Sequence, residues 1–193
     1  MARNAAGNRR ADDASSGRER TIVCEGEYRV SDRPEAVLTA VLGSCISACL
    51  HDPIAGVGGM NHFLLASPGQ AGLADPDAIK RYGVHAMEVL VNELIVRGAS
   101  RATLRAHLYG GANMYAGMRA IGDENASFAR QFLESEGIAL VHADMGGRSA
   151  RRVEFRPAVG LARSRFVVNP ATGPAQSTGL RIVGGEAGEV TLF

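Results

Sequence analysis

The sequence predicts a single α/β (α+β) domain, a layered sandwich in which a mixed β-sheet is covered by helices. The chain has 193 residues, which suits one domain with a sizeable core. Two segments, 77–97 and 123–136, have the apolar periodicity of helices, and short apolar runs around them have the pattern of strands. After residue 65, the predicted order is helix, strand, helix, strand, strand, strand. That order favours a sheet of mixed direction.

The ordered domain is expected over residues 21–168. Residues 1–20 are polar, small and of mixed charge, so they cannot bury enough apolar surface to offset the entropy of ordering, and we expect a disordered tail. Residues 169–193 form an extension that begins as a linker and ends in two short apolar pieces. These pieces could pair as a hairpin or hang as a tail.

Composition excludes several classes of protein. The formal net charge is +1, so no global field favours a nucleic-acid partner. No window offers the roughly 18 uninterrupted apolar residues of a membrane span, so no membrane insertion is expected. Three cysteines are an odd number without the density of a disulfide scaffold, which favours the reducing cytoplasm. No motif calls for a cofactor, and no metal site is expected.

The first half of the chain has the pattern of short strands. Segments 21–24 and 27–30 suggest strand pieces that flank a bulge at Glu25 and Gly26, and segment 36–42 leads into a turn. From Cys45 to His62, two apolar runs separated by an Asp-Pro/Gly turn predict a hairpin. The loop at 67–77 is either a lid beside a pocket or a solvated connector.

The second half begins with the strongest helix signal. Segment 77–97 has a broad apolar stripe, so this helix should lie across a sheet, and His85 falls outside the stripe and is expected at the surface. Segment 102–109 alternates as a half-buried strand with His107 on its polar face, where we expect a solvated side chain rather than a ligand or base. After the helix at 123–136 come strands at 138–143, 153–155 and 161–168.

Cys45 and His62 are the candidate catalytic pair. A hairpin return brings a downstream imidazole beside an upstream thiol, and these two groups are what a thiolate nucleophile with a general base requires. Gly43 and Ser44 precede the cysteine and allow a sharp turn there. Two other interpretations stay open: an inert buried thiol, as we expect for Cys49, and a metal site from Cys45, Cys49 and His62, which lacks a fourth ligand.

Gly110 and Gly111 directly follow the predicted strand at 102–109. Such a pair can cradle an anion with backbone N–H groups, but the spacing matches neither the dinucleotide nor the P-loop fingerprint. We therefore favour a tight turn or close backbone packing near a site. Arginines crowd the last third of the domain, where we expect a solvated strand face rather than contact with acidic helices: Arg148, Arg151, Arg152, Arg156, Arg163 and Arg165.

Seven short motifs occur in one order along the chain: LGSC (42–45), HDP (51–53), GGMNHFLL (58–65), RYG (81–83), YGGANM (109–114), IGDEN (121–125) and DMGG (144–147). Together they resemble the chemoreceptor glutamine deamidase family, CheD, of bacterial chemotaxis. The resemblance runs over about residues 28–168. It implies a layered fold related to cysteine-based deamidases and hydrolysis of receptor glutamine side chains to glutamate through a cysteine thiolate and a thioester.

The resemblance also implies site residues and partners. The family's nucleophile corresponds to Cys45, its histidine to His62, and its threonine to Thr39, which would orient the imidazole; from the residues alone, Thr39 is an ordinary strand residue. Backbone N–H groups at the turn formed by Gly43 and Ser44 are oxyanion candidates. Substrate approach is assigned to four glycines: Gly58, Gly59, Gly110 and Gly111. The expected partners are methyl-accepting chemotaxis receptors and a CheC-type phosphatase; otherwise, the chain would act as an adapter that only binds them.

Overall fold

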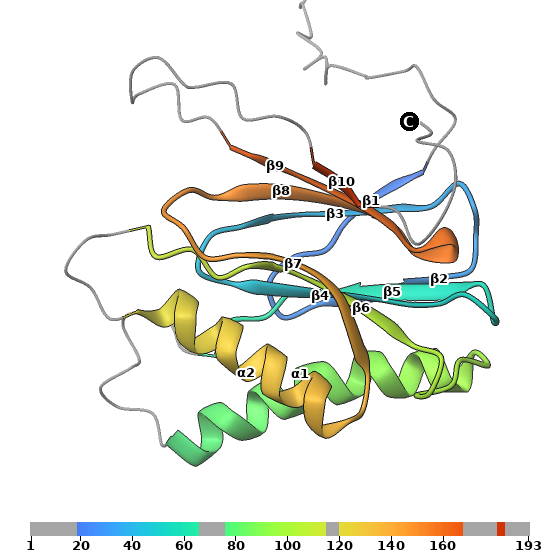
Figure 1. Cartoon of the computed structure of the whole chain (residues 1–193), viewed down its shortest axis with the longest axis horizontal. Helices are drawn as coiled ribbons and strands as arrows, with labels where there is room; N and C mark the ends of the chain where they lie inside the picture. Colours follow the sequence, from blue (N-terminus) through green and yellow to red (C-terminus); the bar gives the residue numbers. More distant parts are fainter. Residues whose placement is uncertain (1–18, 66–75, 115–119, 168–180, 184–193) are drawn as a thin grey trace, which may run out of the picture.

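The computed structural model describes residues 19–65, 76–114, 120–167 and 181–183 (Figure 1). The elements follow in this order: β1 (Arg20–Ile22), β2 (Tyr28–Ser31), β3 (Val37–Leu42), β4 (Ile46–Asp52), β5 (Val57–Asn61), α1 (Pro76–Val96), β6 (Arg105–Gly110), α2 (Ile121–Ser135), β7 (Ala139–Met145), β8 (Arg151–Arg156), the 3₁₀ turn η1 (Pro157–Val159), β9 (Leu161–Phe166) and β10 (Arg181–Val183).

The strands form two five-stranded sheets rather than one. The outer sheet has the order β1-β3-β8-β9-β10, and the middle sheet has the order β2-β5-β4-β6-β7. Figure 1 shows three layers, with α1 and α2 covering the face of the middle sheet that is turned away from the outer sheet. The layered α+β class is thus confirmed. Each sheet contains both parallel and antiparallel pairs, as expected for a mixed topology.

The chain passes from the outer sheet to the middle sheet at residues 43–45, between β3 and β4. The hairpin predicted from this region is confirmed: β4 and β5 pair antiparallel, with Cys49 opposite Met60 and Asp52 opposite Val57. The turn of the hairpin is closed by the Asp52 carboxylate, which accepts the N–H groups of Ile54 and Ala55 at 2.8 and 3.1 Å.

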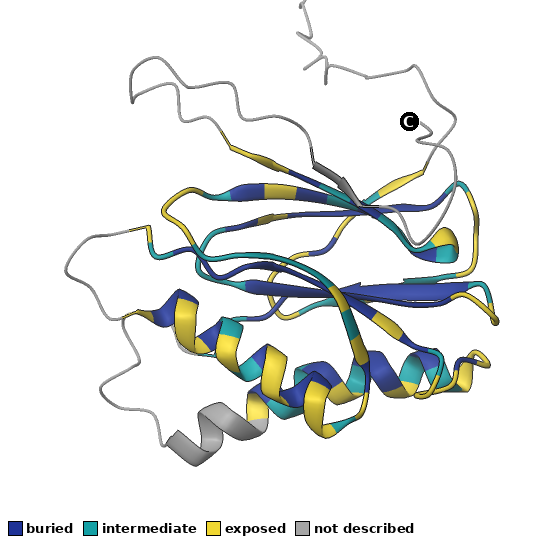
Figure 2. Cartoon of the chain, viewed as in Figure 1, coloured by how far each residue is buried: buried dark blue, intermediate teal, exposed yellow. Residues whose placement is uncertain are grey.

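The centre of the middle sheet is buried on both faces, as the dark strands β4 and β5 show in Figure 2. One core lies between this sheet and the helices and includes Leu90 and Leu94 of α1. The other lies between the two sheets and includes Leu42, Cys49 and Tyr109. Because a sheet with a layer on either side has no solvated face at its centre, every residue of β4 and β5 is buried, whereas the edge strands β2 and β7 are partly exposed.

This double burial corrects the expectation for His107. The period-2 alternation of β6 is present in the sequence, but only Arg105 of its polar row is exposed; Tyr109 packs in the core between the sheets, and His107 is only 5% exposed. Burial lowers the pKa of His107 to about 4, with the neighbouring His142 and His51 acting in the same direction. His107 is therefore a buried neutral residue. His85 is exposed, as predicted.

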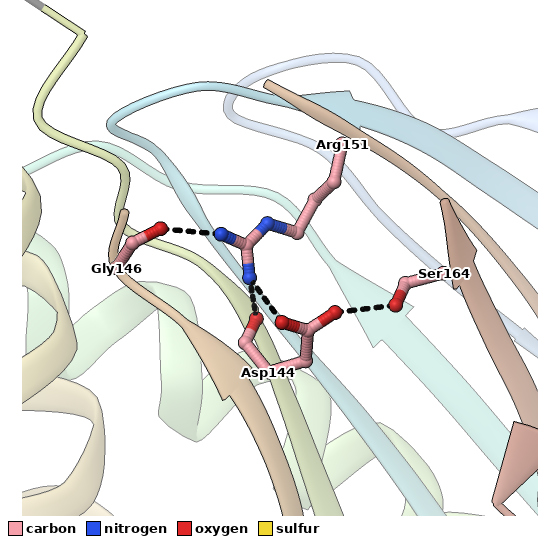
Figure 3. A network of polar contacts seen from close by, with 4 residues as sticks. All are labelled: Asp144, Gly146, Arg151 and Ser164. Atoms are coloured by element: carbon pink, nitrogen blue, oxygen red, sulfur yellow. Dashed lines mark hydrogen bonds and ion pairs between the residues drawn. The ribbon is translucent and has the colours of Figure 1, made fainter. Parts of the chain in front are cut away.

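Arg151 is an exception to the prediction that the arginines at 148–165 lie on a solvated strand face. Arg151 is 2% exposed, and its guanidinium donates to the Asp144 carboxylate at 2.7 Å and to the carbonyl oxygens of Asp144 and Gly146 (Figure 3). Ser164 donates to the other oxygen of the same carboxylate. The expectation of a solvated face is wrong for this residue, because the Arg151 side chain is buried as the hydrogen-bond partner of the turn that follows β7. It also lies opposite Leu42, at the end of β3 just before the crossing between sheets.

Several sequence predictions fall on the remaining parts of the chain. The loop at 66–75 lies outside the described residues, as does the expected tail up to residue 18; β1 already includes Arg20. Of the C-terminal extension, the structure describes β10, which pairs antiparallel with β9. In the part of the chain that is described, no helix is long and apolar enough to cross a membrane.

Candidate active site

The turn at 43–45 is fixed by backbone hydrogen bonds from Gly111 and Ala112, which follow β6. The Gly111 N–H donates to the Cys45 carbonyl at 2.8 Å, and the Ala112 N–H donates to the Gly43 carbonyl at 2.8 Å. Gly110 has φ +109°, and a Cβ there would lie 2.1 Å from the Cys45 carbonyl oxygen. Only glycine fits this close approach. The predicted tight packing at the glycine pair is confirmed, and its contact is the backbone of the candidate nucleophile.

Asn125 holds the same turn from the other side. Its side-chain amide donates to the Ser44 carbonyl at 2.9 Å, and its oxygen accepts the Leu65 N–H at 2.9 Å, with the residue fully buried at the start of α2. The side chain thereby fixes the turn to the segment that follows His62. Sequence reasoning missed this role; the only available signal was the position of Asn125 in the motif IGDEN.

We expect Asn125→Asp to lower kcat/KM for the reaction proposed below by at least about tenfold and to lower the melting temperature. The substitution keeps the acceptor for Leu65 but places a carboxylate oxygen against the Ser44 carbonyl, and an unsatisfied buried group costs roughly 1–3 kcal/mol. Kinetics and thermal unfolding measure the two effects. Asn92→Asp, on the exposed face of α1, is the matched control and should change neither. Unchanged kinetics in Asn125→Asp would contradict the role.

His62 follows β5 and has a defined orientation. Its Nδ1 lies 3.1 Å from the Val23 carbonyl oxygen. A carbonyl only accepts, so Nδ1 carries the proton and Nε2 presents a lone pair. Nε2 is buried and has no hydrogen-bond partner among the described residues. The imidazole, 8% exposed, is therefore set up as a base or a ligand.

Cys45, His62 and Glu25 form one cluster. The Cys45 Sγ, a ring nitrogen of His62 and a carboxylate oxygen of Glu25 all lie within 4.8 Å of one another, and Sγ lies 3.5 Å from Glu25 Oε2. The predicted approach of thiol and imidazole is thus confirmed. Burial raises the pKa of the Cys45 thiol to about 12, and the charge of Glu25 and its hydrogen bond add to the rise. The resting group is a neutral thiol.

Glu25 was not predicted as a site residue. It lies in the turn between β1 and β2, and the sequence indicated only a bulge there. Two backbone hydrogen bonds join this turn to His62: the Gly26 N–H donates to the His62 carbonyl at 2.8 Å, and the His62 N–H donates to the Glu27 carbonyl at 3.0 Å. This pairing carries Glu25 to the thiol. No local pattern could have indicated it.

Thr39 lies in β3, where its hydroxyl donates to the Val153 carbonyl at 2.8 Å. Among the described hydrogen bonds, its link to His62 is indirect: the Thr39 carbonyl accepts the Val23 N–H at 2.9 Å, and the Val23 carbonyl receives the imidazole N–H. Val23 therefore occupies the orienting position that the family resemblance implied for Thr39.

The other glycine candidates lie at packing contacts. A Cβ on Gly58 would lie 2.3 Å from the Pro157 carbonyl oxygen, and one on Gly59 would lie 2.7 Å from side-chain atoms of Leu90 and Val30. Cys49 is fully buried between the sheets and does not belong to the cluster around Cys45. The metal site considered from Cys45, Cys49 and His62 is therefore not formed in the described part of the chain, because Cys49 lies outside the cluster.

Known proteins resemble this chain over most of its length. The family model described as "CheD chemotactic sensory transduction" matches residues 64–165. A protein of Zymomonas mobilis named "Probable chemoreceptor glutamine deamidase CheD" is 53% identical over 175 residues, covering 91% of this chain and 93% of that relative. The chain belongs to the CheD family. A CheD of the same name from Caulobacter vibrioides is 54% identical over 145 residues, covering 75% of this chain and 76% of that relative.

The CheD resemblance inferred from the seven motifs is thereby confirmed. The alignment with the Zymomonas relative is long enough that it spans Thr39, Cys45 and His62 whichever end it omits. Among solved structures, the hypothetical protein YfiH of Bacillus licheniformis is similar at a TM-score of 0.40 and 14% identity, over 61% of this chain and 49% of that one.

Proposed function

We propose that this protein hydrolyses specific glutamine side chains of chemotaxis receptors to glutamate, with Cys45 as nucleophile and His62 as base. The observation that carries the proposal is the meeting of the thiol with an imidazole whose Nε2 has no hydrogen-bond partner in the described part of the chain, which belongs to the CheD family. Relatives at about half identity are named probable chemoreceptor glutamine deamidases. The test is ammonia release from a receptor cytoplasmic fragment, with a mass increase of about one dalton per modified site.

The first step is attack of Cys45 Sγ on the carboxamide carbon. Because the resting thiol is protonated, its proton moves to His62 Nε2 as the carbon–sulfur bond forms. His62 then gives that proton to the departing ammonia, which leaves a thioester. Water, deprotonated by His62, attacks the thioester, and the products are glutamate and the free thiol. The net reaction adds one water and releases one ammonia.

The oxyanion of the tetrahedral intermediate needs fixed donors. The N–H groups of Gly111 and Ala112 are already bonded to the nucleophile turn, so they hold the turn instead of binding substrate. The backbone N–H of Cys45 lies close enough to its own sulfur to oppose the rise in the thiol pKa. We therefore assign the oxyanion to the N–H groups of Cys45 and Ser44, which belong to the turn that carries the nucleophile.

Glu25→Gln is expected to make Cys45 more reactive toward a neutral alkylating agent. Two causes that raise the thiol pKa, the charge and the hydrogen bond of Glu25, are removed or weakened, while burial remains. The pKa then falls, and below the pKa a lower value means more thiolate at any fixed pH. Iodoacetamide alkylation, followed from about pH 7 to about pH 10, measures this shift.

Glu27→Gln is the matched control for that measurement. Its carboxylate belongs to the same turn but accepts the Cys24 N–H at 3.2 Å, so its loss should leave Cys45 unchanged. Equal alkylation profiles for wild type and Glu25→Gln would show that Glu25 does not govern the thiol.

Thr39 is retained as a proposed third member of the catalytic set, acting through Val23. Thr39→Val keeps the branched shape and the backbone acceptor for Val23 but removes the hydroxyl. We expect kcat to fall by about tenfold with little change in KM if the hydroxyl fixes the strand that orients His62. A kcat equal to wild type would limit the contribution of Thr39 to its backbone.

The proposed function also implies a cellular location and a binding partner for this protein. We propose that the protein acts in the cytoplasm, where reducing conditions keep its cysteines as free thiols. Family resemblance supports a CheC-type phosphatase as a second partner. Co-purification of that phosphatase with the full chain tests the interaction. Binding combined with inactivity on a cognate receptor would favour the adapter role.

A further inference from the structure

The cluster at the active site has the composition of a metal site. A thiol, an imidazole and a carboxylate, from Cys45, His62 and Glu25, offer their ligand atoms within 4.8 Å of one another. Tetrahedral zinc with ordinary bond lengths holds a sulfur and an oxygen ligand about 3.6 Å apart. The observed distance from Sγ to Glu25 Oε2 is 3.5 Å. Two of the three ligands are therefore already at the spacing that zinc requires.

His62 supplies an independent observation that points to a ligand. The residue is 8% exposed, and its Nε2 is buried and without a hydrogen-bond partner among the described residues. Its Nδ1 is held by the Val23 carbonyl at 3.1 Å. A histidine that binds a metal generally donates its other ring N–H to a carbonyl or carboxylate in this way. With Nδ1 bonded to the Val23 carbonyl, the Nε2 lone pair can bind a metal without breaking that hydrogen bond.

The third ligand is fixed relative to the histidine. Glu25 precedes Gly26, whose backbone N–H donates to the His62 carbonyl at 2.8 Å. The backbone N–H of His62 in turn donates to the backbone carbonyl of Glu27 at 3.0 Å. The turn and the histidine therefore move together. Because little of this site has to become ordered when a metal binds, little binding free energy is lost to conformational entropy.

We infer that this site binds Zn²⁺ through Cys45 Sγ, His62 Nε2 and Glu25, with water as the fourth ligand, and that the metal reversibly inhibits the enzyme. The thiol proton is released to solvent as the zinc–sulfur bond forms. Thiolate and imidazole select zinc over magnesium or calcium, which prefer oxygen ligands. The bound metal occupies both the nucleophile and the base. The inhibition rests on the proposed function; the binding does not.

Binding is tested on the purified full chain with Co²⁺ as a spectroscopic substitute for zinc. We expect a thiolate-to-cobalt charge-transfer band that zinc abolishes by competition. Cys45→Ser should lose the band, and Glu25→Gln should weaken cobalt binding at least about tenfold. Glu27→Gln and Cys24→Ser, both altered in the same turn, should bind cobalt as the wild type does. A band that persists in Cys45→Ser, or that disappears in Cys24→Ser, would overturn the ligand set.

Inhibition is tested separately by titrating Zn²⁺ into the deamidation assay. The inhibition midpoint should match the zinc affinity obtained by competition, and a chelator should restore activity. Glu25→Gln should need at least about tenfold more zinc for half inhibition. Zinc that binds without inhibiting, or that activates, would refute the inhibitory role. If the metal-free enzyme is inactive on a cognate receptor while the cobalt band is present, the proposed function fails and the metal site stands.

Discussion

Cys45→Ala is expected to abolish glutamine deamidation, lowering kcat by about 10⁴-fold or more. The sulfur forms the covalent bond to the substrate, and it is the thiol that lies in the cluster with His62. Wild type and variant are compared on a receptor cytoplasmic fragment by ammonia release and by peptide mass. The fold should be retained, because Cys45 is only partly buried at the rim of the inter-sheet core.

Cys24→Ser is the matched control for this substitution. Cys24 is an exposed thiol in the turn that also carries Glu25, and it is outside the cluster of Cys45 and His62. Full activity in Cys24→Ser together with none in Cys45→Ala assigns the chemistry to one thiol. Substantial deamidation by Cys45→Ala would refute covalent catalysis at this residue.

Arg151→Met is expected to destabilise the domain by about 3–5 kcal/mol, which lowers the melting temperature by roughly 10 °C. The substitution preserves much of the side-chain volume but leaves the Asp144 carboxylate and the Gly146 carbonyl without their donor (Figure 3). Ser164 remains as a single partner for the carboxylate. Thermal or urea unfolding measures the loss.

Arg152→Met is the control on the adjacent residue, whose side chain is exposed. Its effect should stay within about 0.5 kcal/mol of wild type. Equal stability of the two variants would mean that the buried network contributes nothing net. Because Arg151 lies opposite Leu42, just before the nucleophile turn, Arg151→Met should also lower kcat at temperatures where it remains folded.

The sequence alone was sufficient to predict where the two helices lie. The helix expected over 77–97 is Pro76–Val96, and the one expected over 123–136 is Ile121–Ser135. Apolar periodicity is a local property, so it marks a helix or strand without knowledge of its neighbours. The same property could not show that the strands divide into two sheets. That division is decided by which strands pair across long sequence separations, such as β3 with β8.

Burial on the second face of a strand was also beyond the sequence. His107 and Arg151 carry polar groups that favour solvent, and both are buried because another layer or turn covers them. Alternation identifies two faces of a strand but not what lies against each. A polar row is therefore read as solvated unless the partner is known.

The sequence by itself determined the residues of the hairpin, and so the meeting of Cys45 with His62, which are joined by a short connection of defined geometry. Only the tertiary structure decided the rest of the site. Glu25 reaches the thiol from 20 residues away, and Asn125 reaches the Ser44 carbonyl from 81 residues away. Such contacts depend on the packing of separate elements, which no local pattern encodes, whereas the hairpin is specified by its own strands and turn.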